Sequence, residues 1–110
     1  YMQPVGFGPM RLMRSELCPM LARVMRPQET LILSPIPYFG GTVARDISSD
    51  DLVADIRAAG ATAPAHVIPT RQDFIAWARD QNFQDTAILI MGARDPTLSV
   101  FAREVAQAVL

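Results

Sequence analysis

The sequence predicts an α/β protein with a Rossmann-like, doubly wound, mostly parallel sheet and helices on both faces. Two observations predict this class: apolar runs typical of buried strands, and amphipathic segments with helix-start signals between them. The two kinds of segment alternate along all 110 residues. Alternation at this spacing favours parallel strands joined by right-handed crossovers. The length predicts one domain that covers residues 1–110.

Four segments have the character of strands. Residues 30–33 and 86–91 are continuous apolar runs, which predict parallel strands covered by helices on both faces. Residues 66–68 are a shorter candidate, and residues 2–5 are typical of the end of a strand. Because that strand would begin upstream of Tyr1, we expect the chain to be one domain of a longer protein.

Four segments have the period of amphipathic helices. The first covers residues 10–25, where Pro19 predicts a kink or a split because proline removes a backbone donor. Ser48–Asp51 and Thr70–Asp73 carry start signals for two more, and Asp95-Pro96 predicts an N-cap and first-turn proline for the last. The residues expected to face inward are Met10, Met13, Leu17, Leu21 and Val24, then Leu52, Val53 and Ile56, then Phe74, Ile75, Trp77 and Ala78, then Leu98, Phe101, Ala102, Val105 and Val109.

The composition excludes several classes of function. All ten basic residues are Arg, so the chain has no P-loop lysine, Schiff-base lysine or carbamylated-lysine metal site. A net charge of −1 gives no general attraction to nucleic acid, and no apolar run approaches the ~20 residues that span a bilayer. Cys18 is the single cysteine, which fits a reducing compartment. We therefore expect a cytoplasmic protein with neither nucleic acid nor membrane as its partner.

Three glycine-containing segments follow the predicted strands, where open α/β sheets bind their ligands. They are residues 6–9, 35–47 and 92–95. The middle segment is long and irregular, and presents two aromatic and two charged side chains: Tyr38, Phe39, Arg45 and Asp46. These suit stacking and the binding of a carboxylate or phosphate. A loop folded over the sheet edge, with its aromatic residues as a plug, explains the same residues equally well.

No complete nucleophile, acid–base or metal constellation is present. An ordinary strand–helix turn explains residues 92–95 more simply than an anion site does. His66 has no second metal-ligating residue beside it, and helix capping explains the pair Asp50 and Asp51. Cys18 and Trp77 are most simply core residues. We therefore expect no catalytic residue and no metal ligand in this chain, which alone should be inactive.

Four motifs in order along the chain carry a resemblance: Gln3-Pro4, the Gly40-Gly41 loop, Ser48-Ser-Asp-Asp-Leu52 and Ile90-Met-Gly-Ala-Arg-Asp95. Together they resemble the C-terminal domain of the Mur ligases, closest to UDP-N-acetylmuramate–L-alanine ligase and its relatives. This family implies ATP-dependent amide-bond formation in peptidoglycan synthesis, through an acyl phosphate. The C-terminal domain of such a ligase closes over ATP and helps to hold the incoming amino acid.

The resemblance also implies cofactors, partners and site residues. ATP and Mg²⁺ would act in the full-length protein, neither held by this chain alone, and the missing lysine would belong to the central domain. The partners would be the central ATP-binding and N-terminal UDP-sugar domains, the UDP-muramyl substrate and the amino acid. Arg45 and Asp46 would contact the amino acid or nucleotide, and Arg94 and Asp95 would meet the closing interface. The residues that shape the loop would be Tyr38, Gly40 and Gly41.

The chain departs from the family pattern at three places. It has Val5-Gly6 where the alanine-adding enzymes have His-Arg, and Pro9 where a second Arg follows, with Arg11 as the nearby candidate to replace it. Arg94 replaces a Gly. Because these positions are expected to contact substrates, we expect a divergent relative with another acceptor. Two alternatives remain: a stand-alone nucleotide- or anion-binding module, and a structural interaction domain.

Overall fold

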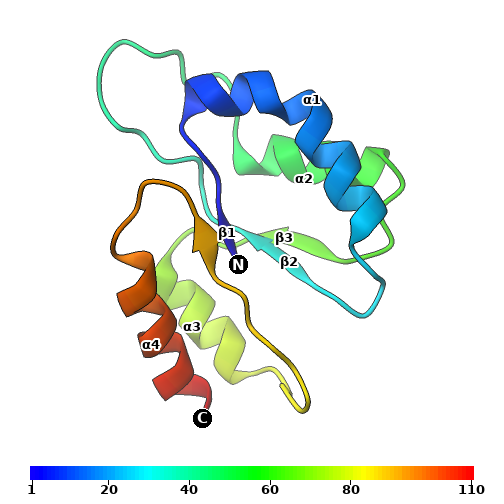
Figure 1. Cartoon of the computed structure of the whole chain (residues 1–110), viewed down its shortest axis with the longest axis vertical. Helices are drawn as coiled ribbons and strands as arrows, with labels where there is room; N and C mark the ends of the chain where they lie inside the picture. Colours follow the sequence, from blue (N-terminus) through cyan, green and yellow to red (C-terminus); the bar gives the residue numbers. More distant parts are fainter.

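Strands and helices alternate along the whole of residues 1–110 in the computed structural model (Figure 1). The elements are β1 (Met2–Gln3), α1 (Phe7–Val24), β2 (Leu31–Leu33), α2 (Ser49–Ala58), β3 (Ala65–Val67), α3 (Arg71–Arg79), β4 (Met91–Gly92) and α4 (Leu98–Val109). The four strands are all parallel and lie in the order β3-β2-β1-β4. This arrangement confirms the predicted α/β class with a Rossmann-like parallel sheet.

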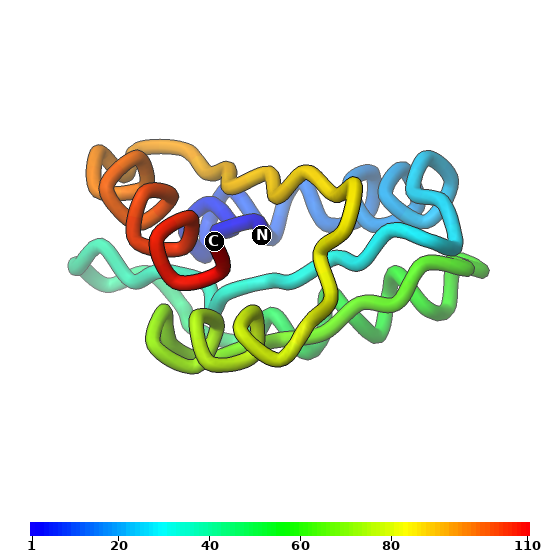
Figure 2. The backbone as a smooth tube through the Cα atoms, turned by 90° about the horizontal axis from the view of Figure 1, so that it is seen from below, coloured from blue at the N-terminus to red at the C-terminus, as the bar shows by residue number.

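The sheet is covered on both faces, by α1 and α2 on one and by α3 and α4 on the other (Figure 1). Successive residues of β2 show the two faces, since side chains alternate along a strand. Leu31 and Leu33 belong to the core under α1 and α2, and Ile32 to the core under α3 and α4. Figure 2 shows the same layers from the α3/α4 side. The strand predicted at residues 30–33 is therefore buried on both faces, as expected.

The strand order creates a reversal of direction in the middle of the sheet. The chain moves outward from β1 to β3, and then crosses to the other face and returns to place β4 beside β1. Met2 pairs with Leu33 on one side and with Met91 on the other. The carboxyl ends of β1 and β4 therefore form a topological switch point, where folds of this class bind ligands.

Helix α1 starts three residues earlier than predicted and runs unbroken through Pro19. Pro19 and Ser15 are exposed, so water can satisfy the Ser15 carbonyl that loses its donor. The predicted inward face is partly wrong, because Met13 is 45 % and Val24 55 % exposed. The buried residues of this helix are Met10 and Cys18. No helix of this fold has both the length and the apolar character needed to cross a membrane.

The helix starts were predicted with different success. Ser48 accepts from the amide of Asp51, whose side chain accepts from the Ser48 amide, so α2 has a full capping box. Thr70 caps α3 through the Asp73 amide at 3.0 Å. The prediction for α4 is wrong by two residues, because the helix begins at Leu98 after Thr97. Its expected cap, Asp95, instead accepts from the Thr97 amide in the turn before the helix.

The strand predicted at residues 86–91 is not buried on both faces. Regular pairing is confined to β4, and Leu89 is 68 % and Met91 48 % exposed. Ile88 and Ile90 pack against the α3/α4 core. Met91 shares a face with its partner Met2, on the α1/α2 side. Because β4 is an edge strand, its outer part on that side lacks the helix cover that β2 has.

Candidate functional site

The loops that follow the four strands meet at one end of the sheet, here called the carboxyl edge. It comprises residues 4–6, 34–47, 68–70 and 92–97. The long loop at residues 34–47 extends outward at the upper left of Figure 1, with the turn between β4 and α4 below it. The predicted site residues lie on these loops, except for Arg11, which projects from α1 to the long loop.

The long loop is organised around one tyrosine. The Tyr38 hydroxyl donates to the Gly41 carbonyl at 2.5 Å, and the Arg45 guanidinium lies 4.1 Å from the centre of the Tyr38 ring. Gly40 and Gly41 have φ angles of +95° and +82°, a region that favours glycine. The structure thus brings together four of the predicted residues, and the glycine pair turns the loop through a backbone conformation that favours glycine.

Arg11 is bound to the base of the loop. Its Nη2 donates to the Ala44 carbonyl at 2.7 Å, and its Nε donates to Oδ1 of Asp46 at 3.2 Å. The two charged side chains are partly exposed, at 39 % for Arg11 and 62 % for Asp46. In this arrangement Arg11 and Asp46 hold the loop on α1, and a ligand would have to compete with that contact.

Arg94 has an unusual backbone. Its φ of +64° lies in the left-handed region, which costs a side-chain-bearing residue about 1–2 kcal/mol. Its guanidinium lies 5.1 Å from the centre of the Phe39 ring and forms no ion pair. Arg45 likewise forms no ion pair. Strained backbone conformations of this kind are more common at functional sites, so the backbone of Arg94 makes this residue a candidate for a functional role.

Asp95 belongs to a polar network that joins α3, β1 and the turn before α4. Arg71 donates from Nη2 to Asp95 Oδ2 at 2.9 Å and from Nη1 to Thr97 Oγ1 at 2.8 Å. The same Nη2 lies 3.4 Å from Oε1 of Gln3. Hydrogen bonds from Thr97, then Gln3, together with the charge of Arg71, hold the pKa of Asp95 at about 2. The carboxylate is therefore fully ionised at neutral pH and committed to this network.

Sequence reasoning missed Thr97, which lies in the carboxyl edge, and Arg71, which reaches that edge from α3. Their signal was available only in part, since Thr70–Asp73 was recognised as a helix start, which places Arg71 in the first turn of the helix after β3. Gly92, in one of the three glycine-containing segments, has a packing role. A Cβ on Gly92 would lie 2.8 Å from Cδ1 of Leu98 and 3.0 Å from Cβ of Gln3.

A hollow of about 230 Å³ lies at the start of α2, beside the carboxyl ends of β2 and β3. Its lining includes Phe7, Ile36, Ser49 and Pro69. Ser49 donates from Oγ to the Ser34 carbonyl at 2.5 Å. The Ser34 hydroxyl is buried and has no hydrogen-bond partner. The hollow therefore adds room at the carboxyl edge, and Asp50 is the one charged residue in its lining.

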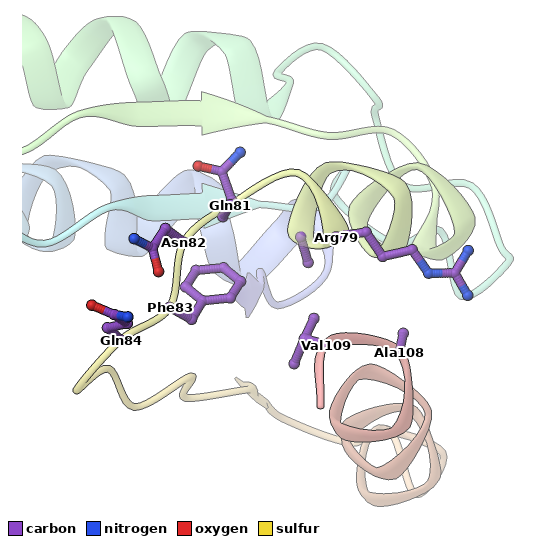
Figure 3. A pocket seen from close by; sticks show the side chains of 8 residues that line it. Arg79, Gln81, Asn82, Phe83, Gln84, Ala108 and Val109 are labelled. Carbon is purple, nitrogen blue, oxygen red and sulfur yellow. The ribbon is translucent and has the colours of Figure 1, made fainter.

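A second hollow, of about 320 Å³, lies at the opposite end of the molecule, between the last turns of α3 and α4 (Figure 3). It is lined by Ala78, Arg79, Gln81, Asn82, Phe83, Gln84, Ala108 and Val109. In Figure 3 the Phe83 ring lies beside the ends of the two helices, and the amide side chains lie on the side of the ring away from them. Apart from Arg79 the lining is uncharged, so this hollow offers little to a charged ligand.

The other residues considered singly in the sequence analysis have structural positions in the fold. His66 is exposed on β3, Asp51 serves the α2 cap, and Cys18 is buried, which raises the pKa of its thiol. Trp77 is only half-buried, against Phe74 and Phe83. No group of three or more His, Cys, Asp or Glu side chains is placed to hold a metal ion.

Comparison with protein-family models, with curated proteins and with solved structures finds no match for this chain. Function must therefore be inferred from the residues and geometry of the carboxyl edge.

Proposed function

We propose that this chain is the C-terminal domain of a Mur-type, ATP-dependent amide ligase, which closes over ATP and helps to bind the incoming amino acid. The observation that carries the proposal is that four separate motifs meet at the carboxyl edge. Gln3-Pro4 ends β1, Gly40-Gly41 lies in the loop after β2, Ser48 caps α2, and Gly92–Asp95 follows the start of β4. Residues far apart in sequence are thereby gathered beside a switch point, the usual ligand position in open α/β sheets.

The backbone at Arg94 supports the same proposal. The resemblance expects glycine at this position, and the φ of +64° is a conformation that glycine adopts without steric cost. A chain descended from a glycine-containing turn would keep this geometry after the substitution to arginine. The new guanidinium would then face the ligands, which fits a relative with another acceptor.

The charges of the edge suit anionic ligands. Arg45 and Arg94 are exposed and form no ion pair, and guanidinium groups bind phosphate and carboxylate with paired, directional hydrogen bonds. ATP in such a ligase activates an acid as its acyl phosphate. This chain would contribute Arg45 to the nucleotide or amino acid and Arg94 to the closing interface. The donors for Mg²⁺ would come from the central domain, because no cluster of carboxylates lies at this edge.

The test is to replace Arg45 in the full-length ligase and measure ligation against ATP and amino acid. We expect Arg45→Ala to lower kcat/KM by about tenfold or more, the usual cost of losing a hydrogen bond to a charged group. Arg103→Ala is the matched control, because Arg103 is exposed on α4 and forms no ion pair. An unchanged kcat/KM for Arg45→Ala would remove Arg45 from the site.

The coding sequence upstream of Tyr1 gives an independent test. A P-loop with Gly-Lys-Ser or Gly-Lys-Thr in a central domain is expected there. A stop codon or an unrelated domain directly upstream would refute the ligase.

A second candidate is a stand-alone nucleotide- or anion-binding module, favoured by the exposed and unpaired guanidinium groups of Arg45 and Arg94. Titration of the chain alone with ATP and with UDP-sugars, followed by NMR, separates the two. Chemical-shift changes at the carboxyl edge with a saturating isotherm would favour the module. No change at millimolar ligand would exclude it and leave the edge dependent on the other domains.

A further inference from the structure

The inner side of the long loop lies on the first turn of α1. A Cβ added to Gly6 would lie 3.2 Å from Cδ2 of Phe39, and one added to Gly8 would lie 3.9 Å from Cγ2 of Val43. Phe39 therefore lies directly against the backbone that leaves β1. The absence of a side chain at Gly6 is what allows this close approach, since a Cβ there would be tighter than ordinary van der Waals contact.

The Phe39 ring also contacts the turn after β4. The Arg94 guanidinium lies 5.1 Å from the ring centre, within the range of a cation–π contact. One half-exposed ring thus connects the carboxyl end of β1 to the carboxyl end of β4. Those two ends define the switch point, so Phe39 lies across the position that a ligand of this fold would approach.

The loop has a second attachment and a glycine tip. Arg11 holds its far end through the Ala44 carbonyl and the Asp46 carboxylate. Between the two attachments, Gly40 and Gly41 have positive φ angles, and a Cβ on either would have no atom within 4 Å. The segment is therefore fastened to the fold at both ends, and its glycine tip is closed by the Tyr38 hydroxyl within the loop itself, which is the construction of a strap.

We propose that residues 37–46 form a self-occluding strap, in which Phe39 covers the switch point and must leave before a ligand enters. The inference deepens the proposed function and rests on it for the identity of the ligand, the nucleotide or amino acid of the ligase. Ligand affinity then depends on the fraction of molecules with the strap released, since only those are competent to bind. Arg94 has two roles, as the clasp of the strap and, once released, as a free guanidinium for an anion.

The strap itself is tested without ligand, by NMR on the chain. The ring current of Phe39 displaces the side-chain resonances of Arg94, and Phe39→Leu gives their positions with the ring removed. Gly6→Ala is the decisive variant, because Gly6 has φ −62° and ψ 171°, which alanine also adopts, so the methyl crowds the Phe39 ring and meets the Pro37 carbonyl only at ordinary contact distance. Gly8→Ala is the matched control, with a contact of ordinary length.

We expect Gly6→Ala to move the Arg94 resonances toward those of Phe39→Leu, and Gly8→Ala to leave them at the wild-type positions. Identical Arg94 resonances in the wild type and Phe39→Leu would overturn the strap, because the ring would then not lie under the guanidinium.

The occlusion is tested in the full-length ligase. Phe39→Leu is expected to lower KM for ATP or the amino acid by about two- to fivefold, the population shift that loss of one exposed cation–π contact produces. An unchanged or raised KM would overturn the proposal, because Phe39 would then not stand in the path of the ligand. Failure of the proposed function is recognised separately, as ligation that does not respond to Arg45→Ala.

Discussion

The two ends of the sheet are built from different side chains. At the carboxyl edge, Arg11 and Arg71 bind carboxylates, and the guanidinium groups of Arg45 and Arg94 lie over aromatic rings. At the opposite end, here called the amino edge, the hollow of Figure 3 has neutral amide side chains, of which Gln81 binds the Trp77 carbonyl at 3.2 Å. The larger hollow is thus at the end with less charge.

The volume available to a ligand and the charged groups that could bind one therefore lie at different ends of the sheet. A hollow of about 320 Å³ at the amino edge offers space, but its lining has one cation, Arg79, and no carboxylate. The carboxyl edge offers less space and many directional charged groups, in the place that the strand order designates for ligands. The strand order and the charges therefore favour the carboxyl edge as the candidate site, although the hollow at the amino edge is larger.

The largest expected effect on stability comes from Phe101, whose buried ring packs under the Arg71 guanidinium. Phe101 is 1 % exposed, packs against Phe74 and Tyr1, and lies 4.9 Å from the Arg71 guanidinium. Phe101→Ala is expected to lower the free energy of unfolding by about 3–5 kcal/mol, because it leaves a cavity and removes support from Arg71. Urea denaturation measures this loss. A change below about 1 kcal/mol would mean that the α3/α4 core does not carry the edge.

A smaller loss is expected at Gly92. Its Cβ would meet Leu98 at 2.8 Å and Gln3 at 3.0 Å, so Gly92→Ala should cost about 1–3 kcal/mol through overpacking. Gly8→Ala, where the space is open to 3.9 Å, provides the comparison and should be close to neutral. Equal stability of the two variants in urea denaturation would show that β4 and α4 do not pack as closely as described.

Arg94 separates backbone strain from side-chain contact. Arg94→Gly and Arg94→Ala both remove the guanidinium from Phe39, but only glycine relieves the φ of +64°. We expect the glycine variant to be more stable than the alanine variant by about 1 kcal/mol. Thermal unfolding of the pair is the measurement. An alanine variant as stable as the glycine variant would contradict the left-handed backbone at this turn.

The pH dependence of stability isolates the Asp95 network. The pKa of Asp95 is about 2 in the folded chain, below its ordinary value of 3.8. The folded state therefore binds fewer protons than the unfolded chain in this window, and the stabilisation is present above about pH 4 and lost toward pH 2. Asp95→Asn should show a shallower loss of stability between these pH values, measured by urea denaturation. Parallel curves for the two proteins would contradict the network.

Much of the fold could be predicted from local patterns. The Ser48 and Thr70 caps could be predicted because the interacting residues lie three positions apart in the sequence. The exposure of Leu89 could not be predicted, because an apolar run does not show whether its strand lies in the middle or at the edge of the sheet. The exposure of Met13 and Val24 on α1 was also missed, since the Arg14–Asp55 ion pair that helps to orient this helix joins residues far apart in sequence.

The candidate site was predicted by residue type and not by contact. Tyr38, Arg45 and Asp46 were selected because an irregular, glycine-containing segment follows a buried strand. Their partners could not be predicted, because Arg11 reaches Asp46 across 35 positions and Arg71 reaches Asp95 across 24. From the residues alone, the loop could equally be an aromatic plug over the sheet edge or a ligand-binding loop. In the proposed strap both hold, because Phe39 covers the position where a ligand would bind.

We propose that the ligands of the proposed full-length ligase bind at the carboxyl edge. The most direct test of this proposal is modification by phenylglyoxal, a reagent for exposed arginine, with and without MgATP and the amino acid. Arg45 and Arg94 represent the carboxyl edge and Arg79 the amino edge, and all three side chains are exposed. The account predicts that the ligands protect Arg45 and Arg94 and leave the modification of Arg79 unchanged. Equal modification of Arg45 and Arg94 with and without ligands, or protection confined to Arg79, would contradict it.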